Sequence, residues 1–175
     1  ACLAAIILEA ALYIGLRRRA IRKRWGDVRA GLWLALTRFS LLQLRGQEEA
    51  PRNWRPHILL FVGDTAKRIG LVRLANWFNQ NRGIVTACKL VEGDLEKLAP
   101  EIDRMHAEIY ADLQQANLKI FSEVDVVSDF ESGAVNVVQA NGIAGLQSNT
   151  VMFGWSRRKE RLESQLRIMR AMSYA

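Results

Sequence analysis

The sequence is poor in the side chains that most often build catalytic and metal centres. It has only two cysteines and two histidines among 175 residues. Cys2 and Cys88 lie far apart, and no combination of these residues has the spacing of a zinc site. Neither His57 nor His106 has a nucleophile or a carboxylate at a diagnostic spacing. We therefore expect no enzyme and no bound metal, and two buried cysteines in a reducing compartment.

Phosphate-binding loops are also missing. The sequence contains no GxxxxGK[ST] motif, and the turn after the first predicted strand reads Gly63-Asp64-Thr65-Ala66 instead of GxGxxG. The glycines at positions 142 and 145 fit a helix end followed by a turn as well as they fit a phosphate loop. A nucleotide cofactor is therefore only weakly supported.

Almost all of the chain's net positive charge lies in one short segment. The formal net charge is +7, and residues 17–29 alone carry seven Arg or Lys and one Asp. A nucleic-acid-binding domain would spread its cations over a groove-sized face, whereas these cations directly follow an apolar run. We expect residues Arg17 to Arg24 to contact anionic lipid headgroups, and we expect no nucleic acid as a partner.

The apolar run covers residues 1–16 and is interrupted by one charged side chain, Glu9. As a helix it would be about 24 Å long, short of the ~30 Å hydrocarbon core of a bilayer. It is consistent with the end of a transmembrane helix in a longer protein, and a buried helix of a soluble domain is the alternative. The cations after it place everything beyond Arg17 in the cytoplasm, next to the cell membrane.

Residues 17–52 are predicted to form a basic juxtamembrane segment, a connecting helix over 25–45 and a polar linker. The helix is too apolar for a single packing stripe. Such surface marks an interface, so we expect this helix to join two copies of the chain in a homodimer. A helix lying on the membrane surface and a helix packed on the following domain are the alternatives.

Residues 53–175 alternate between strand and helix patterns. Strands are predicted at 57–62, 84–91, 118–127 and 150–155, and helices at 66–81, 101–116, 129–141 and 156–172. This alternation predicts an α/β domain with an open, doubly wound, mostly parallel sheet. The helix at 66–81 is expected to bury Ile69, Val72, Leu74, Trp77 and Phe78 and to end at Gly83, and Pro100 is expected in the first turn of the next helix.

One candidate binding site follows from this topology. Ligands of open α/β sheets bind beyond the carboxyl ends of the strands. If the first and fourth strands are neighbours, Gly63, Asp64 and Thr65 meet Gly154 and Ser156 there, where helix N-termini favour an anion such as a nucleotide phosphate.

Two motifs resemble a known family. Residues 52–63, RNWRPHILLFVG, resemble the start of the cytosolic C-terminal domain of cation-chloride cotransporters, and residues 141–155, NGIAGLQSNTVMFGW, resemble a later stretch of that domain. Ala144 departs from that stretch, where a glycine is usual. The segment from Trp25 to Val28 resembles the connecting helix of prokaryotic members of the amino acid permease type. Together the resemblance covers residues 25–160.

The resemblance implies a secondary active transporter of the amino acid–polyamine–organocation superfamily. It implies a domain similar to universal stress proteins that regulates transport and dimerises, with the chain's own upstream transmembrane domain as a partner. The ion sites of the family lie in upstream membrane helices. A membrane-anchored, nucleotide-binding module of the universal stress protein type is the alternative, although the glycine-rich signature of the ATP-binding members is missing.

Overall fold

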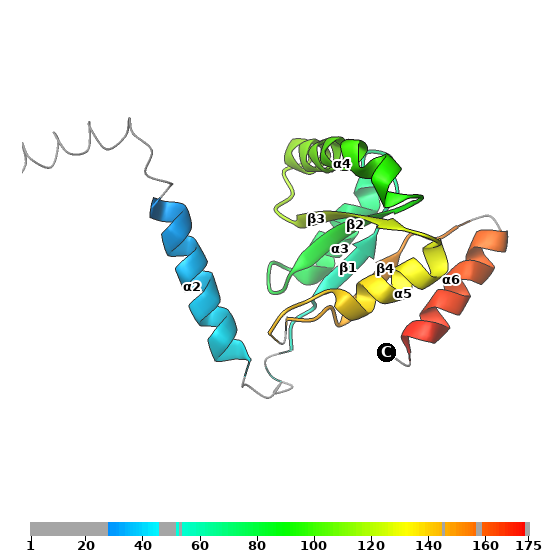
Figure 1. Cartoon of the computed structure of the whole chain (residues 1–175). Coiled ribbons are helices and arrows are strands. Elements are labelled where there is room, and N and C mark those ends of the chain that lie inside the picture. The colour runs from blue at the N-terminus through cyan, green and yellow to red at the C-terminus, as the bar shows by residue number, and fades with distance from the viewer. Residues whose placement is uncertain (1–27, 46–51, 53, 145, 157–158, 174–175) are drawn as a thin grey trace, which may run out of the picture. The chain divides into compact units, whose positions relative to one another are not determined.

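The computed structural model (Figure 1) describes residues 28–45, 52, 54–144, 146–156 and 159–173. The chain divides into two compact units, residues 1–46 and 47–175. The predicted membrane segment 1–16 and the basic cluster 17–24 lie outside the described residues. Among the helices that are described, none is both long and apolar enough to cross a bilayer.

Helix α2 is the described part of the first unit and covers Val28–Leu44, within the predicted helix 25–45. Its large apolar side chains point in several directions around the helix axis. Leu32, Trp33 and Leu34 are consecutive and therefore point in directions about 100° apart, yet 58, 66 and 71% of their surfaces are exposed. The structure thus shows a helix whose apolar side chains do not form one stripe.

The second unit is built on a four-stranded parallel sheet, which confirms the predicted α/β class (Figure 1). Its strands are β1 (Ile58–Phe61), β2 (Val85–Glu92), β3 (Phe121–Val127) and β4 (Thr150–Phe153), in the order β3-β2-β1-β4. β1 pairs with both β2 and β4, so that Leu60 lies between Ala87 and Met152. A central strand covered on both faces requires a continuous apolar run, and all four residues of β1 are buried.

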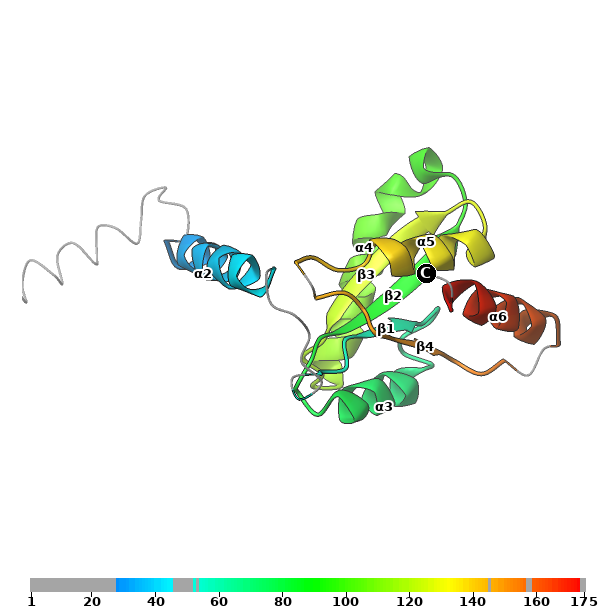
Figure 2. The same cartoon turned by 90° about the horizontal axis from the view of Figure 1, so that it is seen from below.

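Helices cover both faces of the sheet. α3 (Ile69–Asn79) and α4 (Leu95–Gln115) pack on one face, and α5 (Phe130–Ala140) and α6 (Lys159–Met172) pack on the other (Figures 1 and 2). The side chains of β1 alternate between the two cores: Leu60 joins one and Leu59 the other. Both are fully buried, and each such leucine contributes about 1.5–3 kcal/mol through apolar burial.

The buried face of α3 agrees with the prediction at Ile69 and Val72 and differs from it at the other three predicted residues. Val72, Ala75 and Asn79 face the core, whereas Leu74 and Trp77 are 48 and 71% exposed. Phe78 is also exposed, at 50%. The predicted face was chosen by size and apolar character, but the closest helix–sheet contact is made by smaller side chains.

The end of α3 also differs from the expected glycine cap. The left-handed residue that ends the helix is Gln80, with φ 53°. Gly83 is required for another reason: a Cβ atom on it would lie 2.1 Å from the Pro56 carbonyl oxygen. A close approach between two backbone segments, and not a helix cap, explains this glycine.

α4 begins six residues earlier than predicted. Asp94 caps it by accepting a hydrogen bond from the Glu96 backbone N–H at 3.1 Å. Pro100 therefore lies inside the helix and not in its first turn. The proline removes the N–H that would bond to the Glu96 carbonyl, and both residues are exposed, so water can satisfy that carbonyl.

Ala144 adopts a backbone conformation that suits glycine, with φ 55°. A left-handed conformation costs an alanine about 1–2 kcal/mol. We expect Ala144→Gly to raise the free energy of unfolding by up to about 1 kcal/mol. The gain is smaller than the full cost of the left-handed conformation, because glycine also increases the conformational entropy of the unfolded chain. Urea denaturation of the two chains measures the difference, and a less stable variant would show that Ala144 makes contacts that outweigh its strain.

Candidate functional site

A cavity lies at the carboxyl edge of the sheet, where β1 and β4 end side by side. Phe61 pairs with Phe153 in the ladder, so the turns that follow these strands meet. Gly63, Asp64, Gly154 and Ser156 all line a cavity of about 620 Å³. The structure therefore brings together four of the five residues that the sequence predicted for this site.

Thr65 is the exception. Its side chain does not line the cavity. It is buried, and its hydroxyl has no hydrogen-bond partner in the part of the chain that the structure describes. Thr65 is therefore the one predicted site residue that the structure does not place in the cavity lining.

The floor of the cavity is aromatic. The rings of Phe61 and Phe153 stack with centroids 5.1 Å apart, and Phe130 of α5 adds a third ring to the lining. Such stacked rings bury a large apolar area. The floor suits a planar or apolar part of a ligand, with polar groups reaching the rim.

Helix α6 supplies a wall that sequence reasoning missed. Arg161, Ser164 and Gln165 line the cavity, and Gln165 Nε2 donates to the Gly154 carbonyl at 2.8 Å. The order of the predicted elements could have indicated this wall. A helix that follows β4 begins at the carboxyl edge of the sheet, so the residues of its first turns lie beside the site.

Two arginines and two carboxylates line the cavity. Arg68, at the start of α3, packs against Gly154 so closely that a Cβ atom there would meet its Nη1 at 2.0 Å. Arg161 comes from α6, and the carboxylates are Asp64 and Glu92. Asp64 accepts a hydrogen bond from the Lys67 backbone N–H at 3.0 Å and forms an ion pair with its ammonium at 2.7 Å. The hydrogen bond from the Lys67 side chain holds the pKa of Asp64 below its usual value.

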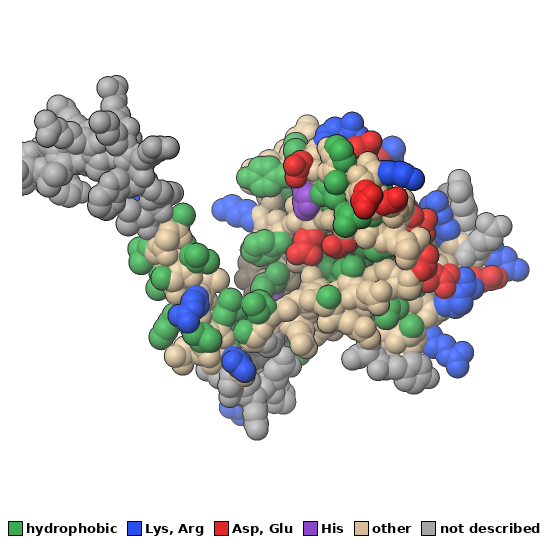
Figure 3. All heavy atoms as spheres, viewed as in Figure 1, with side chains coloured by type: hydrophobic (Ala, Val, Ile, Leu, Met, Phe, Trp, Pro, Cys, Tyr) green, Lys and Arg blue, Asp and Glu red, His purple; other side chains and the backbone are tan. Residues whose placement is uncertain are grey.

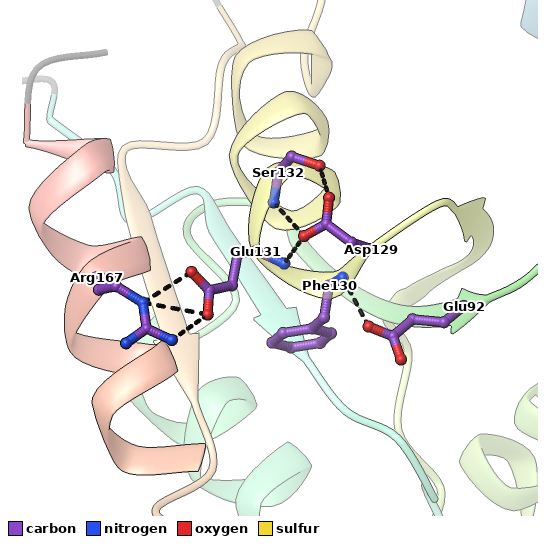
Figure 4. Close-up of polar contacts among 6 residues, drawn as sticks. All are labelled: Glu92, Asp129, Phe130, Glu131, Ser132 and Arg167. Carbon is purple, nitrogen blue, oxygen red and sulfur yellow. Dashed lines mark hydrogen bonds and ion pairs between the residues drawn. The ribbon is translucent and has the colours of Figure 1, made fainter. Parts of the chain in front are cut away.

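The N-terminus of α5 is occupied by its own side chains (Figure 4). Asp129 accepts hydrogen bonds from the backbone N–H groups of Glu131 at 2.9 Å and Ser132 at 3.1 Å, and the Ser132 hydroxyl also donates to it. These bonds, led by that from the Ser132 hydroxyl, lower the pKa of Asp129. Glu92 accepts from the Phe130 N–H at 2.8 Å. This helix end is therefore not open to an added anion.

An ion pair holds α6 against α5. Arg167 Nε donates to Glu131 Oε2 at 2.9 Å, and the same guanidinium also reaches Oε1 (Figure 4). The side-chain hydrogen bond from Arg167 lowers the pKa of Glu131. This bidentate pair links α5 to the helix that walls the cavity.

Cys88 lies in the cavity lining but is not a reactive thiol. It is fully buried in β2, and its Sγ donates to Asp125 Oδ2 at 3.3 Å. Burial, reinforced by the neighbouring Asp125 carboxylate, raises the pKa of the thiol. A raised pKa lowers the thiolate fraction at neutral pH, and the thiolate is the nucleophile.

We therefore expect alkylation of Cys88 to be much slower in the folded chain than in unfolded chain at the same pH. Iodoacetamide labelling of a Cys2→Ser chain, followed by mass spectrometry with and without urea, measures both rates. The native rate should rise with added denaturant, as opening of the sheet does. Equal labelling rates in folded and unfolded chain would contradict the buried, protonated thiol.

The two family-like motifs contact each other at the opposite, amino edge of the sheet. Asn149 Nδ2 donates to the Arg55 carbonyl at 2.7 Å, and its Oδ1 accepts from the His57 N–H at 3.0 Å. Asn79 Nδ2 donates to the Pro56 carbonyl at 2.7 Å. His57 Nδ1 in turn accepts from the Ile84 N–H at 3.2 Å. These contacts give both motifs a structural role in fixing where the chain enters β1.

The described residues contain no cluster of metal-binding side chains. No group of three or more His, Cys, Asp or Glu side chains in that part of the chain is close enough to hold an ion. The arrangement at the carboxyl edge is instead a cavity with an aromatic floor and a mixed-charge rim.

Comparisons with known proteins identify the family. Residues 68–167 match the sequence profile described as "Solute carrier family 12". The chain is similar to the potassium/chloride cotransporter 3 of Caenorhabditis elegans, with 25% identity over 170 aligned residues that cover 91% of this chain. The match covers 16% of that relative, so this chain spans about a sixth of its length. The chain belongs to solute carrier family 12, the family of cation-chloride cotransporters.

Proposed function

We propose that this chain is the cytosolic regulatory and dimerisation region of a secondary active membrane transporter. Family membership links it to a membrane cotransporter. In this proposal residues 1–16 end a transmembrane helix and the chain beyond Arg17 is cytoplasmic. Residues 17–24 contact anionic headgroups, and the α/β domain controls transport that is carried out by membrane helices upstream.

The observation that carries the dimer is the surface of α2. Side chains of this helix are mainly hydrophobic in the space-filling view, with few cations among them (Figure 3). Phe39 is 61% exposed and Leu42 51% exposed, in addition to the consecutive apolar residues described above. Each side chain of this size gains about 1.5–3 kcal/mol when it is fully buried. A second α2 offers an equivalent apolar surface and satisfies both copies.

The relative's name suggests the ions. By extension from the potassium/chloride cotransporter, we propose coupled movement of a cation and chloride. Reconstituting the full-length transporter in liposomes and measuring chloride-dependent potassium uptake tests the regulatory role. Monomeric variants of α2 should change the rate of uptake without changing its preference for potassium over sodium. A changed ion preference would mean that this region takes part in ion binding, and an unchanged rate would remove the regulatory role.

A nucleotide or another anion in the cavity is a second candidate function. Arg68 and Arg161 line the cavity together with a stacked aromatic floor, and such a pairing suits a phosphate attached to a flat ring. Calorimetric titration with ATP and ADP measures this binding, with Arg68→Gln as the variant expected to weaken it. Equal affinity in Arg68→Gln would show that any bound nucleotide lies elsewhere.

A further inference from the structure

α3 carries a second apolar face that none of the described residues of its own domain covers. Val72, Ala75 and Asn79 point into the core, while Leu74, Trp77 and Phe78 point outward and are exposed. Figure 2 shows α3 at the margin of the α/β domain, with no other labelled element of that domain over its outer side. A helix that is apolar on both sides has a partner on each, since exposed apolar patches mark interaction sites.

Positive charge frames this outer face. Arg73 lies on α3, Lys67 precedes the helix and Arg82 follows it, and all three are exposed. No Asp or Glu occurs between residues 65 and 91. The helix therefore combines outward aromatic side chains with cations at both of its ends.

Two acidic residues lie near the cations of this face, fewer than the cations themselves. Asp64 is paired with Lys67 at 2.7 Å. Asp112 of α4 shares a small groove with Arg73 beside α3. Arg82 lies in the stretch between residues 65 and 91, which contains no Asp or Glu, so cations outnumber carboxylates around the outer face.

The segment that leads into β1 extends the same surface. Asn79, at the end of α3, donates to the Pro56 carbonyl at 2.7 Å, which places Pro56 beside that end of the helix, directly after Trp54 and Arg55 in the chain. Trp54 is 52% exposed, and Arg52 and Arg55 are exposed as well. This segment therefore adds one more aromatic ring and two more cations next to the outer face.

We propose that the outer face of α3, together with Arg52 and residues 54–56, docks on an anionic lipid bilayer. Trp and Phe side chains favour the interfacial zone of a bilayer, and Lys and Arg beside them are attracted to anionic headgroups. Family membership places the chain in a membrane protein, so a bilayer is close by. Docking is independent of the dimer contact proposed for α2.

The size of the face favours lipid over a protein partner. A stable protein interface involves about 20–30 residues on each side, whereas the outward apolar side chains of α3 are only Leu74, Trp77 and Phe78. An interfacial helix, in contrast, needs only a few inserted rings with cations around them. The composition of α3 matches the second case.

A probe on α3 tests the proposal in the complete chain. With Cys2→Ser as background, Trp77→Cys is labelled with a fluorophore whose emission shifts to the blue in apolar surroundings. The control label is Asn136→Cys, an exposed position on α5 on the opposite face of the sheet. Vesicles of phosphatidylcholine and phosphatidylserine should shift the emission at position 77 and leave position 136 unchanged. Vesicles of phosphatidylcholine alone should shift neither.

Charge variants measure the electrostatic part. Arg73→Gln and Arg82→Gln should each lower the ratio of docked to undocked α3 about fivefold, which corresponds to about 1 kcal/mol per cation. Lys119→Gln, an exposed lysine before β3, is the matched control and should have no effect. The shift should also decrease as salt is added.

Three results would overturn the proposal. The first is an unchanged probe at position 77 while the chain itself sediments with the vesicles. The second is an equal shift at positions 77 and 136, which would show general adsorption. The third is a shift at position 77 that appears without vesicles and grows with chain concentration, which would assign the face to protein contacts.

Discussion

Replacing Gly83 with alanine should lower the free energy of unfolding of the α/β domain by about 3 kcal/mol. The added Cβ would lie 2.1 Å from the Pro56 carbonyl oxygen and 3.0 Å from Asn79 Nδ2. It would thus separate the backbone segments that the buried Asn79–Pro56 hydrogen bond joins. Losing that bond leaves buried polar groups unpaired, which adds to the steric cost.

Urea denaturation, followed by circular dichroism, measures the Gly83→Ala effect. Gly70→Ala is the matched control, because nothing lies within 4 Å of a Cβ atom at that position in α3. Alanine is favoured over glycine in a helix by about 0.5–1 kcal/mol, so this control should be slightly stabilised. A Gly83→Ala chain as stable as the parent would contradict the close approach.

An added carboxylate should destabilise the domain far more on the buried face of α3 than on its exposed face. Val72 is completely buried, so Val72→Asp places a charge in the apolar core and should unfold the domain or cost at least about 3 kcal/mol. Trp77 is 71% exposed, and Trp77→Asp should change the free energy of unfolding by less than about 1 kcal/mol.

Thermal unfolding of both aspartate variants provides the comparison, with Val72→Ala and Trp77→Ala as uncharged partners. If Trp77→Asp were as damaging as Val72→Asp, Trp77 would belong to the core, as its size and apolar character suggested. The structure places Trp77 on the surface, so comparing the stabilities of the two aspartate variants distinguishes the observed orientation of α3 from the predicted one.

The sheet could be predicted because its strands have distinct patterns. β1 is a short and wholly apolar run, as a central parallel strand requires. Asp129, just before α5, is a helix N-cap that can be recognised from the sequence. Where such local signals exist, predicted and observed boundaries agree within a few residues, and only Pro100 gave a misleading start.

The orientation of α3 could not be predicted because it depends on long-range contacts. Asn79 is a polar residue, yet it is buried because it bonds to the Pro56 carbonyl across the fold. Hydrophobicity alone favours Trp77 and Phe78 for the core. Pro56, the partner that allows Asn79 to be buried, is distant in the sequence, so a local pattern does not reveal the hydrogen bond.

The candidate site was predicted in part for a related reason. Gly63 and Gly154 follow neighbouring strands, and the adjacency of those strands brings them to one cavity. Arg161 and Gln165 were missed because their contribution depends on where α6 rests. The topology indicates that α6 begins at the carboxyl edge, but its contacts with the rest of the domain, the burial of Ile168 and the Arg167–Glu131 pair, are long-range.

The central claim is that α2 joins two copies of this regulatory region. The oligomeric state of the complete chain tests it most directly. Light scattering in detergent should give the mass of a dimer for the parent chain. Trp33→Glu combined with Leu41→Glu should give a monomer, because carboxylates would enter an apolar contact. Arg38→Glu changes the net charge by the same amount and should leave the dimer intact. A dimer that survives the double substitution would contradict the account and leave the membrane surface as the partner of α2.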